Sequence, residues 1–281
     1  MICRQSLPIM LAVHPLAIPQ PSVPMPVFPD VKLDATALAN AQEIFLTREA
    51  EFGDFTETNS RHYAEERAYK DEVRHLFART ITPQLFRSDA GSPWEVIKAV
   101  QHVLTTRLEA GDGPQNIIGW RYQSFLRGMN EVERMLFARS FGELLYGQGE
   151  SPEKVERFIR TMWPTMIRVS GQKNPYALTR IFPTFFLMLQ DPARDIAVRT
   201  DLFSRSSRML LGSSILQDQP FDAETYRHVL AFSNTVQRAL MSWGWCPRDL
   251  IDVHSFLWTV SRTDEEFRML TAGSPYDQRE D

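Results

Sequence analysis

The stretch DAETYRHVLAFSNTVQRALMSWG, residues 222–244, decides the fold class of this chain. Asp222 stands before a run of apolar residues at helical spacing, and Gly244 follows the run where a left-handed terminator is expected. A carboxylate in the position of Asp222 accepts a hydrogen bond from the free N–H groups of a first helical turn. The stretch therefore predicts a capped, amphipathic helix. Its apolar positions are Val229, Leu230, Phe232, Val236 and Leu240.

The same start signals recur along the chain. Ser92-Pro93-Trp94-Glu95 combines a hydroxyl cap, proline at the first helical position and glutamate at the third, and Asn130 with Glu133 repeats the capping logic. Alternating β patterns and tight hairpin turns are missing from the sequence. We therefore predict an all-α fold, a compact multi-helix bundle of about nine or ten helices. Further predicted starts are Asp34, Asn59 or Ser60, Ser151, Pro175, Thr200, as the cap of a helix from Asp201 to Leu211, and Pro247.

Several helix boundaries follow from glycine and proline. The helix that begins at Ser92 is expected to run to Gly111, and Pro164 is expected to kink or end the helix that begins at Ser151. The second helix carries two charge pairs at i,i+4, which support a helix there. These pairs are Glu66 with Lys70 and Arg67 with Asp71.

The two ends of the chain differ in composition from the middle. Residues 1–30 hold seven of the 18 prolines, which favours a flexible, extended tail. Residues 263–281 form a predicted acidic tail. The segment between them, residues 31–262, is the predicted helical domain, with a soft division near 147–151.

Composition describes a soluble globular protein. Of 281 residues, 43% are hydrophobic, and the net charge is −4. The two cysteines, Cys3 and Cys246, form no CxxC pair and fit a reducing cytoplasm, where we predict the protein resides. The apolar run Ile181–Leu189 is too short to span a bilayer, so no membrane partner is expected.

Motifs of common enzyme classes are missing from the sequence. It contains no GxxxxGK[ST] phosphate loop and no HExxH, and its six histidines never fall at i,i+4 on one helix. We predict no catalytic residue, no metal and no cofactor. One cluster leaves two interpretations open. Asp249, Asp252 and His254 could serve a metal-dependent enzyme, or Asp249 could cap a helix while Asp252 pairs with an arginine.

Positive charge is concentrated in the middle of the chain. From Lys154 to Arg208 there are ten basic residues against four acidic ones, and eight of the ten are arginine, whose planar fork suits phosphate and carboxylate alike. The alternative is that these arginines pair with the acidic first third of the chain or with an acidic partner. The predicted binding residues for DNA phosphates or a partner are Arg180, Arg194, Arg199, Arg205 and Arg208.

Three stretches carry a resemblance to a known group of proteins. They are EERAYK (Glu65–Lys70), FPTFFLMLQDPARDIAVRTDLFSRSSRMLLG (Phe182–Gly212) and CPRDLIDVHSFLWTV (Cys246–Val260). Their arrangement, over about residues 40–262, resembles the helical regions associated with McrB-type restriction AAA+ ATPases in bacterial defence loci. The chain departs from that pattern because it has no ATPase module and has His254 where a glutamine is expected. The resemblance implies no catalytic residue, but it implies a separate AAA+ ATPase or nuclease partner.

The sequence thus leads to three functional hypotheses. The first is a non-catalytic helical binding module in restriction or anti-phage defence, which engages DNA phosphates or a motor or nuclease partner through an arginine-rich face. The alternative is a protein–protein interaction scaffold that does not bind nucleic acid. The third is a metal-dependent enzyme that uses Asp249, Asp252 and His254. Partner identity and oligomeric state do not follow from the sequence.

Overall fold

The protein is all-α, as predicted. The computed structural model describes residues 31–87, 92–108, 118, 121–216 and 221–266, and this part of the chain contains ten α-helices and no strand. The predicted tail 1–30 and most of the predicted tail 263–281 lie outside the described residues.

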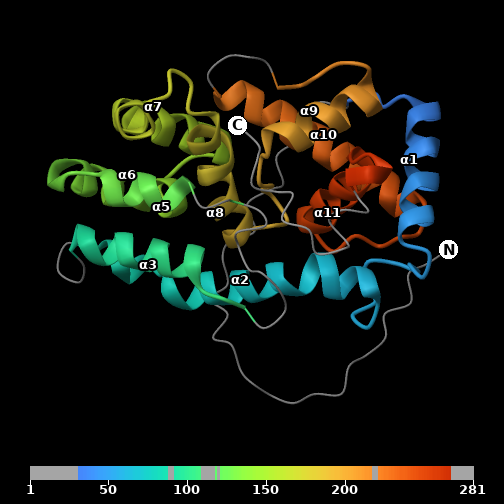
Figure 1. The fold of residues 1–281 in the computed structure, drawn as a ribbon, viewed down its shortest axis with the longest axis horizontal. Helices are drawn as coiled ribbons and strands as arrows, with labels where there is room; N and C mark the ends of the chain where they lie inside the picture. Colours follow the sequence, from blue (N-terminus) through green and yellow to red (C-terminus); the bar gives the residue numbers. More distant parts are fainter. Residues whose placement is uncertain (1–30, 88–91, 109–117, 119–120, 217–220, 267–281) are drawn as a thin grey trace.

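Three shorter helical turns accompany these helices (Figure 1). The helices of the first half are α1 (Ala35–Arg48), α2 (Ala68–Thr80), α3 (Pro93–Thr105), α5 (Arg121–Gly128) and α6 (Glu131–Tyr146). Those of the second half are α7 (Ser151–Ser170), α8 (Phe182–Gln190), α9 (Thr200–Leu211), α10 (Ala223–Ser242) and α11 (Leu250–Ser261). The shorter turns are the π-helical η1 (Tyr63–Arg67), the 3₁₀ turn η2 (Pro83–Phe86) and the π-helical η3 (Ala177–Ile181).

Most of the predicted caps form. The carboxylates of Asp34 and Asp222 each accept a hydrogen bond of 2.8 Å from an N–H of the first turn of their helices. Asn130 forms the predicted capping box, in which both reciprocal hydrogen bonds with Glu133 are present. Gly212 and Gly244 take positive φ angles of 78° and 80° directly after α9 and α10, as a left-handed terminator requires.

Two boundary predictions are wrong, and one predicted capping bond does not form. Helix α3 ends at Thr105 instead of Gly111. It begins after Ser92, as predicted, but the Ser92 side chain makes no capping hydrogen bond. The cap of α9 is Arg199, so Thr200 is the first helical residue and not the cap. Each of these backbones is also held by packing against neighbouring helices, which a local capping pattern does not contain.

Pro164 does not end α7, which continues to Ser170. Proline removes one backbone hydrogen bond, but the residues on both sides of it, Met162 and Met166, are fully buried. Their packing keeps the helix intact.

Helix α8 lies at the centre of the molecule, between the group α5–α7 and the group α9–α11 (Figure 1). Every residue from Phe182 to Leu189 is buried, which explains the short apolar run in the sequence. None of the described helices combines the length and apolarity needed to cross a membrane. Core residues on both sides of the connection 147–150 belong to one hydrophobic cluster.

Candidate functional site

The first of the five predicted arginines, Arg180, lies inside the protein. Its residue is 3% exposed. The guanidinium carbon stacks 4.2 Å from the centroid of the Tyr176 ring, and Nη1 donates a hydrogen bond of 3.3 Å to the hydroxyl of Thr200. A buried guanidinium held in this way does not reach a DNA backbone while η3 keeps its place.

Arg199 and Arg205 interact with other parts of the chain. The guanidinium carbon of Arg199 lies 4.8 Å from the ring centroid of Trp258, and its Nε lies 3.4 Å from the carboxylate of Asp201. Arg205 donates from Nη1 to both carboxylate oxygens of Glu266, at 2.8 and 2.9 Å. Carboxylates of the chain therefore offset both charges.

Arg194 and Arg208 are the two predicted residues whose charge faces outward. Arg208 is exposed on α9, and Arg194 is half-buried in the loop after α8. No ion pair among the described residues involves either of them. The structure thus does not bring all five arginines to one exposed face. A charge count along the chain cannot anticipate this, because Glu266, the partner of Arg205, lies 61 residues away.

The second predicted cluster is a buried ion-pair network between η1 and α11. Arg67, at the end of η1, is 4% exposed. Its guanidinium contacts both oxygens of Asp249, at 2.7 and 2.8 Å, and one oxygen of Asp252, at 2.8 Å. Burial opposes the charge of Arg67, but the surrounding carboxylates outweigh that effect and raise the pKa of its guanidinium.

The structural interpretation of the two aspartates is therefore confirmed. Asp249 caps α11 by accepting a hydrogen bond from the N–H of Ile251, and Asp252 pairs with Arg67 and with Arg248, whose Nε lies 3.2 Å from its carboxylate. Guanidinium groups occupy the oxygens that a metal would need. Among the described residues, no group of three or more His, Cys, Asp or Glu side chains is placed to hold a metal ion.

Lys70 continues this network inside the protein, and His254 is buried nearby, close enough for the charge of Lys70 to affect its imidazole. Lys70 is 1% exposed, and its Nζ lies 2.8 Å from the hydroxyl of Ser255 and 3.0 Å from the carboxylate of Glu66. Burial lowers the pKa of Lys70. Burial, together with the charges of Lys70 and Arg199, holds the pKa of His254 well below its ordinary value, so its imidazole is neutral. The network ties η1 and α2 to α11.

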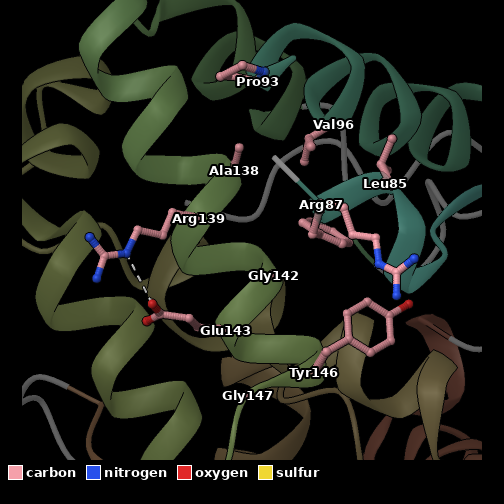
Figure 2. Close-up of a pocket in the computed structure, with 11 residues that line it drawn as sticks. Leu85, Arg87, Pro93, Val96, Ala138, Arg139, Gly142, Glu143, Tyr146 and Gly147 are labelled. Atoms are coloured by element: carbon pink, nitrogen blue, oxygen red, sulfur yellow. Dashed lines mark hydrogen bonds and ion pairs between the residues drawn. The ribbon is translucent and has the colours of Figure 1, made fainter. Parts of the chain in front are cut away.

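The described surface carries an open groove between α6 on one side and η2 with α3 on the other, called here the α3–α6 groove. It encloses about 440 Å³. Figure 2 shows Leu85, Pro93 and Val96 on the wall opposite α6. The side chains of Arg139 and Glu143 extend from α6 in the direction away from that wall. On the α6 side the groove is lined by the small residues Ala138 and Gly142, and Tyr146 lies at one end of it.

Beside this groove, α6 exposes a row of side chains called here the α6 ridge, which consists of Val132, Met135, Arg139, Glu143 and Tyr146. Val132 is 68% exposed, Met135 49% and Tyr146 37%. The residues recur three or four positions apart, so they lie along one side of the helix. Arg139 and Glu143 pair with each other at 3.1 Å.

Trp94 extends this apolar surface onto α3. It is 44% exposed. The guanidinium carbon of Arg134 lies 4.8 Å from its ring centroid, and the Lys98 ammonium lies 6.0 Å from it. These cation–π contacts link the first turn of α3 to α6 and hold the indole at the surface.

Sequence reasoning missed the α6 ridge. The opposite face of the helix carries Leu136, Phe137, Phe141 and Leu144 at helical spacing, and this face packs into the core. The available signal was that Val132 and Met135 fall outside that buried stripe. An apolar residue on the polar side of an amphipathic helix marks surface that the chain itself does not cover.

Comparison with family models, with curated proteins and with solved structures finds no match. The resemblance to the helical regions associated with McrB-type ATPases therefore stays a prediction.

Proposed function

We propose that this chain is a non-catalytic helical interaction module that docks a protein partner on the α6 ridge and the adjoining α3–α6 groove. One observation carries the proposal. Six large hydrophobic residues are exposed among the described residues; three of them lie on the α6 ridge and a fourth lies on α3, which packs against α6. Contiguous exposed apolar surface with a polar rim is characteristic of protein-binding sites. The four are Trp94, Val132, Met135 and Tyr146; the other two, Leu46 and Met241, lie on α1 and α10.

Charged groups lie within this surface and at its border. Arg139 and Glu143 are highly exposed, with side chains 79% and 54% accessible. Arg87 is exposed on the opposite wall of the groove. Such groups select a partner and steer its approach more than they add affinity.

The non-catalytic part of the proposal is supported by the state of the cluster that the sequence indicated as a candidate enzyme site. Asp249 and Asp252 are held by Arg67, and His254 is buried, with 4% of its surface exposed. A general base or a metal ligand needs an accessible lone pair. The network instead has the features of a structural junction between two segments distant in sequence.

A photo-crosslinking amino acid at position 132 tests the proposal. In cells we expect one defined protein adduct, which Met135→Asp removes because a buried carboxylate would disfavour the contact. The same crosslinker at Met241, which is 60% exposed on α10, serves as the control. Equal adducts at both positions, or none at position 132, would contradict the proposal.

DNA binding in a restriction or anti-phage context, with an AAA+ ATPase or nuclease partner, is the second candidate function. The outward charges of Arg194 and Arg208 favour it. If they contact phosphates, DNA affinity falls steeply with salt, and changing both to alanine reduces the slope of log affinity against log salt by about two. Absent or salt-independent binding would exclude this candidate.

A further inference from the structure

We propose that the partner on the α6 ridge is a second copy of this chain, packed with its α6 antiparallel to the first. The inference rests on the proposed function, because it names the partner of the same face. It follows from the order of side chains along the ridge: two apolar residues, a base, an acid and an aromatic residue. That order is complementary to itself when the helix is reversed.

The charged pair fixes the register. A two-fold axis passing the helix at the level of Phe141 places Arg139 of each copy opposite Glu143 of the other. The pair that now forms within one helix at 3.1 Å then extends to a ring of four alternating charges. If the two-fold axis passed the helix at the level of Arg139 or of Glu143, each of these residues would face its own copy, and like charges would meet. A parallel arrangement of the two helices would also bring like charges together.

The same register joins the apolar parts of the ridge. Met135 of each copy then lies against Tyr146 of the other, and Val132 lies at the two ends of the contact. Tyr146 is suited to this contact because its hydroxyl already donates a 2.7 Å hydrogen bond to the carbonyl of Ile81. Its ring is held in place before a partner arrives, which lowers the entropy cost of docking.

The proposed contact between the two copies of α6 is small, so the dimer is expected to be weak. Helix α6 has 16 residues and is about 24 Å long. One helix face with its margins covers less than the roughly 800 Å² per partner of a standard interface. The expected dimer is therefore weak and dependent on concentration, and the exposure of Val132 and Met135 in one copy is compatible with a soluble monomer at low concentration.

Sedimentation velocity over a concentration series is the first test. The full chain is expected to shift from monomer to dimer, and Met135→Asp is expected to leave only monomer. Met241→Asp changes a methionine on α10 that is 60% exposed, against 49% for Met135, and this variant should dimerise like the unchanged chain. Circular dichroism checks that each variant is folded. A chain that stays monomeric at every concentration, or equal loss in both variants, overturns the inference.

Charge reversal tests the register. Arg139→Glu alone and Glu143→Arg alone each place like charges across the two-fold axis and should weaken the dimer at least several-fold. The double variant R139E/E143R restores opposite charges and should recover dimerisation. A double variant as weak as the single ones would contradict the antiparallel pairing.

A disulfide trap measures the same register directly. A mixture of Met135→Cys and Tyr146→Cys chains should form a covalent dimer under mild oxidation, whereas M135C alone should not exceed the background of the unchanged chain. Equal trapping in M135C alone would overturn the register. If the chain remains monomeric while the crosslinker at position 132 captures a different protein, the inference fails but the proposed function stands.

Discussion

Arg67 is the residue on which the buried network depends. It meets Asp249, Asp252 and Asp71 at distances between 2.7 and 2.8 Å, and these carboxylates come from both η1–α2 and α11. A buried ion pair is weak evidence of net stabilisation, because desolvation offsets its Coulomb energy. Removing one partner is different, since it leaves the others charged and buried.

We therefore expect Arg67→Met to lower the free energy of unfolding by about 3–5 kcal/mol, the typical cost of breaking a buried pair. The matched control is Arg61→Met. It removes the exposed ion pair between Arg61 and Glu65, which lies just before Arg67 in the chain. That change should cost about 0.5 kcal/mol or less. Urea denaturation of both variants measures the difference, and equal costs would contradict the assigned role of Arg67.

Asp195 is a second buried acid, and it titrates near neutral pH. It is 3% exposed, and its carboxylate accepts hydrogen bonds from Ser151 at 2.8 Å and Tyr226 at 3.0 Å. Burial raises its pKa from the ordinary 3.8 to about 6, against the opposing effect of these donors and Lys154. Between these two values the folded chain holds a proton that the unfolded chain has released.

The contribution of Asp195 to the free energy of unfolding therefore falls as the pH rises from about 3.8 to about 6. Above about pH 6 the folded protein holds a buried, charged carboxylate, and this contribution has been lost completely. Asp195→Asn keeps the shape of the side chain and removes the charge. We compare the free energy of unfolding of the variant with that of the unchanged chain at each pH. We expect this difference to move in favour of the variant between pH 4 and pH 7, by up to about 3 kcal/mol. Denaturant unfolding at both pH values measures this, and parallel curves would show that Asp195 does not titrate as described.

At the scale of the element, α3 and α6 begin with similar sequences but are capped differently. In α6 both bonds of the Asn130–Glu133 capping box form, at 3.0 and 2.8 Å. In α3 the Ser92 side chain makes no capping bond, although the sequence Ser-Pro-Trp-Glu fits the pattern equally well. The first turn of α3 is instead fixed by the contact of Trp94 with Arg134.

Asn130→Ala is expected to destabilise the protein by about 1 kcal/mol, because it leaves an N–H of α6 without its acceptor. Ser92→Ala should change stability by no more than a few tenths of a kcal/mol. Thermal or urea unfolding of the two variants compares them on the same chain. A larger loss for Ser92→Ala would mean that its hydroxyl caps α3 in solution.

At the scale of the whole molecule, one hydrophobic cluster connects the described helices. It includes Phe141 on α6, Phe158 on α7 and Phe182 on α8, whose rings pack within 6.5 Å of one another. We expect the helical domain to unfold in one transition, with far-ultraviolet circular dichroism and tryptophan fluorescence changing together. Two separate transitions would instead support a division near residues 147–151.

Much of the fold was predictable because it rests on local physics. The stretch 222–244 has its capping aspartate, its apolar stripe and its glycine in one short window, and all three act as expected. The end of α3 at Thr105 and the continuation of α7 past Pro164 were not predictable in this way. There, packing between helices outweighs the preference of a single residue.

The candidate site was less accessible to sequence reasoning. The pairs Glu66–Lys70 and Arg67–Asp71 were correctly expected at i,i+4, but their burial against α11 was not. The five arginines of the middle segment were grouped by their position in the chain. The structure separates them, because Arg180 turns inward and Arg205 meets Glu266.

By itself, the sequence determined that this protein is helical and where most of its helices begin and end, since capping and periodicity act over a few neighbouring residues. Only the tertiary structure decided which charges are neutralised and which apolar side chains are left at the surface. Those outcomes depend on partners up to 216 residues away, as with Arg48 and Asp264. For the same reason, the α6 ridge is recognisable only after the other faces of α6 have found their partners.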